Sequence, residues 1–362
     1  MVNLSQLGNS LYRGDVSYNI VGRRKAWYVV SAVLMVVSIA TLGVRGLNLG
    51  IEFKGGAEFS VPLTSADDSS VTQARETVLA AGETPSTVTV VGGKTVRIQT
   101  PALSTEASNA LSAALAESFG VTEANIKVQL VGPSWGDEVT KNALRALLVF
   151  LILVAIFLSI YFEWQMAVAA LIALAHDVLI TVGIYALSGF EVTPASVIGF
   201  LTILGYSLYD TVVVFDKVKE NTKGIHGGAR TTYSEAANLA LNQTLVRSIN
   251  TSVVALLPVL SILIVGVSLL GVGTLNDLSL ALFVGMLVGT YSSIFVATPF
   301  LCQMKERVAE NIALAKRVQA RRKGSDSSVD SKPEVAVGVQ TVAPAGPRQQ
   351  RVKQTRSRRS GN

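Results

Sequence analysis

Six long apolar runs dominate the pattern of hydrophobic and polar positions along the chain. Each run has roughly 17 to 25 residues with few charges, the length that a helix needs to cross a bilayer. A long polar segment separates the first run from the second, whereas the other gaps are shorter. The pattern predicts membrane-spanning helices at Trp27–Val44, Ala143–Phe162, Met166–Leu187, Thr193–Phe215, Ile249–Leu270 and Leu278–Leu301.

The polar segment from Gly46 to about Thr140 has the patterning of a folded domain. Gly92 and Gly93 separate two alternating runs, as in a tight hairpin, because glycine accepts the positive φ angles of such turns. The order βαββαβ, counting a weak initial strand near Leu49–Phe53, predicts a ferredoxin-like α+β sandwich with its helices on one face of the sheet. The other predicted strands are Ala57–Leu63, Ser86–Val91, Lys94–Thr100 and Asn125–Val131, and the helices are Ser69–Ala81 and Ser104–Phe119.

This domain lacks a pattern of catalytic residues. It contains no histidine to complete a nucleophilic triad or a metal site, and its acidic residues are scattered over predicted helix and turn surfaces. The single cysteine of the chain, Cys302, excludes a disulfide framework and a cysteine-based metal cluster. We therefore expect a binding or lever element without a cofactor, and not an enzyme. The acidic residues on these predicted surfaces include Asp67, Asp68, Glu76, Glu83, Glu117 and Glu123.

Basic residues set the expected orientation in the membrane. Lysine and arginine lie before the first apolar run, between the fourth and fifth, and after the sixth, whereas Ser188–Val192 and Gly271–Asp277 contain neither. The positive-inside rule therefore places both termini in the cytoplasm and the α+β domain outside. The net charge of +6 follows from this topology, so we expect no nucleic-acid partner.

These patterns divide the chain into five parts. The last is a basic cytoplasmic tail whose composition after Lys323 predicts disorder. Its basic residues are expected to be solvated, the alternatives being contacts with anionic lipids or the ribosome. The parts are a cytoplasmic segment 1–26, the first span 27–45, the external domain 46–140, spans two to six at 141–304 with a cytoplasmic loop 216–246, and the tail 305–362.

Ionisable residues inside the predicted spans are the candidates for function. A charge at the centre of a span costs about 2.5 to 3.5 kcal/mol on insertion scales, so it requires a partner, a water-filled cavity or a role. Asp210 in span four and Arg247 at the start of span five fall at the same depth, where they can face each other. Thr251 and Ser252 extend a polar stripe beside Arg247. Asp177, next to His176 in span three, is a further candidate.

Two interpretations of these residues are open. In one, Asp210 binds and releases a proton, and burial and Arg247 set its proton affinity. In the other, Arg247 extends to the lipid headgroups, neighbouring hydroxyls cap Asp210, and Asp177 only fixes helix packing. Small residues predict close packing of the spans: Gly285 and Gly289 form a Gly-x-x-x-Gly face, and Gly199 and Gly205 thin span four.

An ordered series of motifs between Asn19 and Met304 resembles the SecF members of the SecD/SecF family of protein-export membrane proteins. Glu52, where aspartate is often found, and Trp135, where smaller residues are common, are departures from the pattern. The series comprises Gly50–Gly56 after the first span, Gly132–Gly136 before the second, Ala175–Val178 in the third, Gly205–Asp216 in the fourth and Arg247–Ser252 at the start of the fifth.

The resemblance implies one half of a twelve-span transporter of the resistance-nodulation-division (RND) type, completed by SecD, in the bacterial cytoplasmic membrane. The implied partners are SecD, SecYEG, SecA, components of the YajC and YidC type, lipids and unfolded pre-proteins. The implied activity couples pre-protein movement to proton influx. In this family pattern, Asp210 matches the proton-pathway aspartate and Arg247 the arginine of span five.

Three alternatives are weighed against this interpretation. A half-size RND-type exporter of small molecules or lipids would use the same proton relay but should supply both halves or form a homo-oligomer. A non-transporting membrane scaffold would use the polar stripes only to hold helices together. Sodium is the alternative coupling ion, because carboxylate and hydroxyl oxygens also suit Na⁺.

Overall fold

The computed structural model describes residues 4–13, 16–266 and 274–329 of the 362-residue chain. Within them, six helices are long and apolar enough to cross a membrane, and they confirm the six predicted spans. The end of predicted span five, residues 267–270, and part of the turn after it lie outside the described residues. The helices are α2 (Arg24–Arg45), α6 (Pro133–Tyr161), α7 (Trp164–Ser188), α8 (Pro194–Thr222), α9 (Tyr233–Val265), and α10 (Thr274–Ser292) continuing through η4 (Ser293–Ala297) into α11 (Thr298–Lys305).

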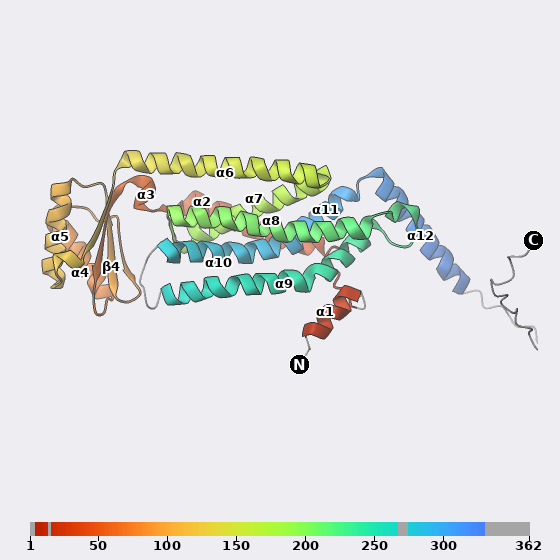
Figure 1. Ribbon diagram of the computed structural model, residues 1–362, viewed down its shortest axis with the longest axis horizontal. Helices are drawn as coiled ribbons and strands as arrows, with labels where there is room; N and C mark the ends of the chain where they lie inside the picture. Colours follow the sequence, from red (N-terminus) through yellow and green to blue (C-terminus); the bar gives the residue numbers. More distant parts are fainter. Residues whose placement is uncertain (1–3, 14–15, 267–273, 330–362) are drawn as a thin grey trace, which may run out of the picture. The chain divides into compact units, whose positions relative to one another are not determined.

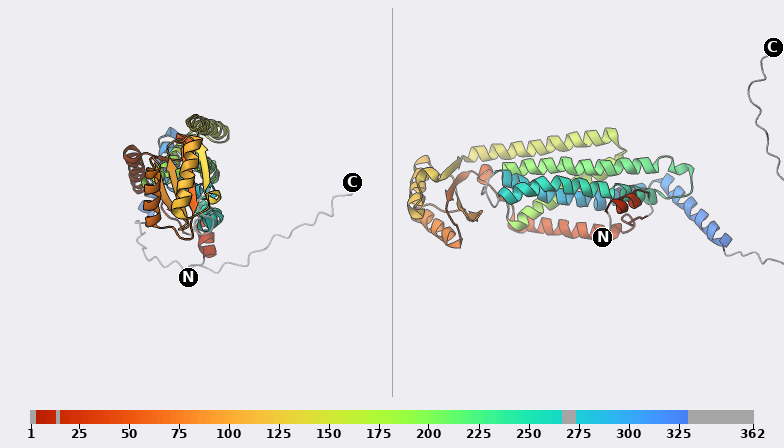
Figure 2. Two further views of the ribbon diagram at one scale, coloured as in Figure 1. Left: turned by 90° about the vertical axis from the view of Figure 1, so that its left-hand side faces the viewer. Right: turned by 60° about the horizontal axis from the view of Figure 1, so that its bottom comes forward.

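The predicted ferredoxin-like domain is present between α2 and α6 (Figure 1). Its strands form one antiparallel sheet in the order β3-β4-β2-β5, and α4 and α5 pack against it. Figure 2 shows the two helices in front of the sheet. In chain order the elements are β2 (Gly56–Pro62), α4 (Asp68–Ala80), β3 (Thr87–Val91), β4 (Thr95–Thr100), α5 (Thr105–Phe119) and β5 (Lys127–Val131).

Alternation of apolar residues explains the core of this domain. Phe59 on β2 and Ile98 on β4 point to the same face and pack with Leu111 and Leu115 of α5, and all four are fully buried. The side chain of Asp67 accepts hydrogen bonds from the amides of Ser69 and Ser70 and so caps α4.

The predicted initial strand Leu49–Phe53 is wrong, and the βαββαβ order forms without it. Only Asn48–Leu49 is a strand, β1, and it pairs in parallel with β6 (Glu191–Val192), which connects α7 to α8. The chain then forms the short helix α3 (Ile51–Lys54). Gly55 and Gly56 follow with φ angles of 77° and 153°, which turn the chain into the sheet.

Glycine positions set how closely the spanning helices pack. A Cβ at Gly285 of α10 would lie 2.2 Å from the Cδ1 atom of Ile203, and one at Gly289 would lie 2.9 Å from the Cβ of Ser207 on α8. Gly199 approaches Ala281 in the same way, which agrees with its predicted role. The prediction for Gly205 is wrong, because open space surrounds its Cα.

Several helices extend beyond the predicted boundaries. The cytoplasmic loop predicted at 216–246 is mostly helical, because α8 continues to Thr222 and α9 begins at Tyr233. Thr232 and Glu235 form a capping box that starts α9. The tail begins with α12 (Ala309–Val329), so the disorder predicted after Lys323 is wrong for residues 324–329; residues 330–362 lie outside the described residues. A short helix, α1 (Leu4–Arg13), precedes the first span.

Candidate functional site

Asp210 lies inside the helix bundle, where α8 packs against α10 and η4. Its side chain is 5% exposed, and the Oγ of Ser293 donates a hydrogen bond of 2.5 Å to its Oδ2. Ser293 begins the π-helical segment η4, a local widening that often accompanies function. The hydroxyl of Thr298 donates to the Ser293 carbonyl (3.3 Å), five residues back. Within the described residues, one side chain, the neutral Ser293 hydroxyl, therefore donates a hydrogen bond to Asp210.

A second buried carboxylate, that of Asp177, lies close by on α7. It is 1% exposed, and the Oγ of Ser207 donates to its Oδ2 at 2.5 Å. His176 Nδ1 lies 3.2 Å from its Oδ1. Because Ser207 and Asp210 are three residues apart on α8, they share one face of that helix. The structure thus brings the two predicted carboxylates into one polar region, with Ser207 between them.

Hydroxyl groups extend this region to α9. Ser252 hydrogen-bonds to Thr290 of α10 (2.8 Å) and accepts from the Tyr206 hydroxyl (3.2 Å). Ser252 therefore lies where the sequence predicted. Thr251 does not join the network, because its hydroxyl donates to the Arg247 carbonyl one turn earlier on the same helix.

The predicted pairing of Arg247 with Asp210 is wrong for this conformation. Arg247 is exposed, and its Nη2 lies 3.5 Å from the Tyr209 hydroxyl; within the described residues no ion pair joins it to Asp210. The face of α9 that carries Ser248 and Ser252 is buried instead. The sequence established the depth of both charges but not the rotation of α9.

Ser293 is the functional candidate that the sequence analysis missed. It stands beside Ser292 one turn after Gly289, and both serines are fully buried. A pair of serines within an apolar run was the available signal, because a buried hydroxyl requires a hydrogen-bond partner. Chemically, the two carboxylates and their hydroxyl donors can hold and pass protons. No group of three or more histidine, cysteine, aspartate or glutamate side chains that could hold a metal ion occurs in the part of the chain that is described.

Interactions at one end of the bundle connect the α+β domain to α7 and α8. Arg97 of β4 forms an ion pair with Glu191 of β6, and the Gln99 amide donates to the same carboxylate at 2.6 Å. The β1–β6 pairing lies next to these contacts along the chain. The domain therefore holds the connection between α7 and α8, the two helices that carry the buried carboxylates.

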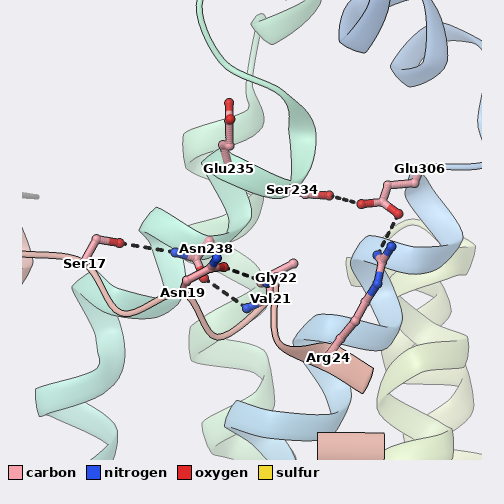
Figure 3. A pocket seen from close by; sticks show the side chains of 9 residues that line it. All are labelled: Ser17, Asn19, Val21, Gly22, Arg24, Ser234, Glu235, Asn238 and Glu306. Atoms are coloured by element: carbon pink, nitrogen blue, oxygen red, sulfur yellow. Dashed lines mark hydrogen bonds and ion pairs between the residues drawn. The ribbon is translucent and has the colours of Figure 1, made fainter. Parts of the chain in front are cut away.

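A polar pocket of about 400 Å³ lies at the opposite end of the bundle (Figure 3). Arg24 of α2 donates to Glu306 at 2.6 Å, and the Ser234 hydroxyl donates to the same carboxylate at 2.6 Å. Asn238 of α9 accepts from the amides of Ile20 and Val21. The segment before the first span is thus fixed to α9 and to the end of α11.

Comparison with known families and proteins gives consistent matches. The family described as "Protein export membrane protein SecD/SecF, C-terminal" matches residues 111–307, and the "SecD/SecF GG Motif" matches residues 40–67. The protein translocase subunit SecF of Streptomyces coelicolor is 47% identical over 99% of this chain and 98% of its own length. SecF of Mycobacterium tuberculosis is 45% identical over 86% of this chain and 72% of its own length.

Solved structures match as well. The crystal structure of SecDF, a translocon-associated membrane protein from Thermus thermophilus, superimposes with a TM-score of 0.72 at 32% identity, over 81% of this chain and 39% of that chain. A SecDF structure in a super-membrane-facing form gives 0.57 at 28% identity, over 87% and 40% of the two chains. The chain therefore spans about two fifths of these longer proteins, and its architecture is that of an RND-like half.

Proposed function

Because the chain belongs to the SecD/SecF family of protein-export membrane proteins, we propose that it is a proton-driven accessory subunit that promotes protein translocation across the bacterial cytoplasmic membrane. The observation that carries this proposal is Asp210, a buried carboxylate whose hydrogen-bond partner is the neutral Ser293 hydroxyl. A carboxyl group at this depth is inexpensive when protonated and costly when ionised. Its environment therefore changes with each proton bound or released.

The hydrogen bond from Ser293 gives this exchange a structural consequence. An ionised Asp210 gains from a donor or a cation, and Arg247 lies one helix away, bonded to the Tyr209 hydroxyl next to Asp210 in sequence. We propose that loss of the proton draws Arg247 toward Asp210 and that rebinding releases it. Such alternation between two arrangements of packed helices is the usual basis of alternating access.

Coupling to a translocating protein would pass through the α+β domain. The Arg97–Glu191 and Gln99–Glu191 contacts and the β1–β6 pairing connect that domain to the turn between α7 and α8. A shift of α8 on protonation of Asp210 would thus be transmitted to the domain through the contacts at this turn. We propose that the domain lies outside the cytoplasm, where it meets the emerging pre-protein, and that both termini are cytoplasmic.

The proposed partners are those that membership of this family implies. We propose that SecD supplies the other six spans and that the complex acts beside SecYEG and SecA, with YajC and YidC-type components. The contacts that hold the α+β domain to α7 and α8 suit a domain that acts on a protein substrate. A half-size exporter that acts as a homo-oligomer would have no protein substrate and would not need them. A scaffold would have no use for a buried carboxylate without a cation. Sodium would need more oxygen ligands than the Ser293 contact alone supplies at Asp210.

The test is pre-protein translocation into inverted membrane vesicles that contain the complex, measured with and without an imposed proton gradient. Asp210→Asn keeps the shape of the side chain and its bond to Ser293 but removes proton exchange, so we expect the gradient-dependent stimulation to be lost while assembly with the partner is kept. Asp216→Asn, an exposed aspartate on the same helix, is the matched control and should respond like the wild type. A full response by Asp210→Asn would refute the proposed role.

A further inference from the structure

A line of buried polar side chains runs along one face of α7. Asp177, Thr181 and Tyr185 are spaced four residues apart, so they stack on the same side of the helix. They are 1%, 3% and 0% exposed. Tyr185 lies one turn from the end of α7, at the connection to β6 that the α+β domain holds. The line therefore leads from that end of the bundle to the carboxylate of Asp177.

Two of these groups contribute little to stability through hydrogen bonds. The hydroxyl of Thr181 is buried and has no hydrogen-bond partner among the described residues, and the buried hydroxyl of Tyr185 lies beside the Ser196 side chain without a hydrogen bond of good geometry. The Tyr185 ring is already fixed by edge contacts with Phe190 and Phe200, at centroid distances of 5.7 and 5.1 Å. A buried hydroxyl without a partner is destabilising, so valine and phenylalanine would serve packing better at these positions.

The space beside this line suits a water molecule. A cavity of about 10 Å³ is lined by Asp177 and Thr181 and closed by apolar side chains of α7 and α8. That is about the smallest cavity that holds one water, which also needs polar partners such as a carboxylate and a hydroxyl. A water here would join Thr181 to Asp177.

The far side of Asp177 continues toward the proposed proton-binding site. Ser207 donates to Asp177 at 2.5 Å and lies one turn from Asp210 on α8. On α7 itself, the titratable side chain within hydrogen-bond distance of Asp177 is that of His176. Tyr185, Thr181 and Asp177 thus follow one another at intervals of one helical turn along α7, Thr181 and Asp177 line one small cavity, and Ser207 links Asp177 to the helix that carries Asp210.

We propose that Tyr185, Thr181 and Asp177 are the entry half of a proton path, which delivers protons from the end of the bundle near the α+β domain to Asp210. Each hydroxyl or water accepts a proton on its oxygen and releases another to the next group, so no group gains a net charge in a complete passage. Asp177 holds the proton in transit, and Ser207 passes it to Asp210. This inference rests on the proposed function of Asp210 and adds the route by which its proton arrives.

The test removes single hydroxyls while keeping side-chain shape. Thr181→Val and Tyr185→Phe should each lose most of the proton-gradient-dependent stimulation of translocation in vesicles, although Thr181→Val removes no hydrogen bond to protein and Tyr185→Phe removes only the weak contact with Ser196. Their thermal unfolding midpoints in detergent should equal or exceed that of the wild type. Thr181→Ser keeps the hydroxyl and should restore stimulation, and Thr202→Val, an exposed position on α8, should have no effect.

The outcomes separate this inference from the proposed function. If Thr181→Val and Tyr185→Phe both keep full stimulation while Asp210→Asn loses it, protons reach Asp210 by another route and the inference is overturned. If all three variants keep full stimulation, the proposed function fails as well. If Thr181→Val does not assemble, Tyr185→Phe alone decides, since its ring contacts are unchanged. Loss in both variants with recovery in Thr181→Ser supports the path.

Discussion

Single hydroxyl groups determine the chemistry available to the two buried carboxylates. The Ser207 hydroxyl donates a hydrogen bond to Asp177 and the Ser293 hydroxyl donates one to Asp210, each with an oxygen–oxygen distance of 2.5 Å. Both donors can rotate and can stabilise an ionised or a protonated carboxyl, which a fixed cation could not do. A neutral donor therefore suits a group that must alternate between two states, whereas a permanent ion pair would favour only one of them.

We expect Ser293→Ala to impair proton coupling because it leaves Asp210 without its donor. Ser293→Thr keeps the hydroxyl and should retain most of the activity. The cost of the lost bond is about 1.5 to 3 kcal/mol when Asp210 is ionised, because hydrogen bonds to charged groups are the stronger ones. Gradient-stimulated translocation in vesicles measures the effect. Equal activity of the alanine and threonine variants would contradict a role for the hydroxyl.

At the surface, the carboxyl of Asp67 allows a prediction about pH. The Ser69 hydroxyl and the amides of Ser70 and Ser69 donate to it and hold its pKa below the usual range. The pKa of Asp67 in the folded protein lies below its unfolded value of about 4. The cap therefore contributes its full stability to α4 above about pH 4, and this stability is lost as the pH falls through the folded pKa. The protection factors of the first amides of α4, which are corrected for the intrinsic exchange rate at each pH, should therefore fall below about pH 4. In Asp67→Asn that fall should be absent; its persistence would contradict the assignment.

The sequence predicts functional residues where their type is rare in a spanning helix. It does not predict them where their position depends on how a helix is rotated about its axis. Asp177 and Asp210 stood out because carboxylates inside apolar runs are expensive. Ser293 did not, since serine is tolerated in spanning helices and only a π-helical turn brings it to Asp210. Arg247 lies on a different face of α9 from the predicted one, because the sequence does not fix the rotation of α9 relative to α8.

At the scale of helices and strands, patterns within one element were reliable and contacts between elements were not. Alternation and turn glycines located the strands of the α+β domain. The β1–β6 pairing joins segments more than a hundred residues apart, and no local pattern signals a two-residue parallel pair. Gly285 and Gly289 were predicted to pack closely, but their shared partner, α8, became clear only from the structure.

This packing separates two glycines of the bundle by their effect on stability. Gly285→Ala places a methyl group against Ile203 and should lower the free energy of unfolding by about 1 to 3 kcal/mol, the usual cost of overpacking. Gly205→Ala faces open space and should be neutral or stabilising by up to about 1 kcal/mol, because alanine favours helix. Thermal unfolding of the purified protein in detergent compares the two. Equal destabilisation would show that helix propensity or lipid contact, and not the α8–α10 distance, governs these sites.

At the scale of the whole described chain, a small set of polar contacts holds the α+β domain to the bundle. Arg97 is mostly buried against Glu191, with 14% and 10% of the two side chains exposed, so this ion pair is less screened than a surface pair. It joins a strand of the domain to the connection between α7 and α8. A force applied to the domain can therefore reach the two helices that carry Asp177 and Asp210 through this contact, in addition to α2 and α6, to which the domain is joined along the chain.

The last prediction tests this mechanical connection. Glu191→Gln removes the charge and leaves Arg97 partly buried without its main counterion, a loss of about 3 to 5 kcal/mol for a fully buried pair and less here. We expect the α+β domain to stay folded, because its core around Phe59 and Ile98 does not involve Glu191. We expect gradient-stimulated translocation to fall, because motion of α7 and α8 no longer reaches the domain.

The charge-reversed double variant Arg97→Glu, Glu191→Arg provides the control. It restores an ion pair between the same two elements but places a glutamate beside Glu58, which lies 3.7 Å from Arg97 in the native protein, so translocation should recover in part relative to either single change, while proton uptake at Asp210 should be unaffected in the two single variants and in the double variant. Limited proteolysis of the purified protein checks that the domain remains folded, and a pH-sensitive dye inside the inverted vesicles follows proton exit from the lumen. If proton exit falls together with translocation in the single variants, the contact acts on the proton path itself. It would then not be the link between that path and the domain.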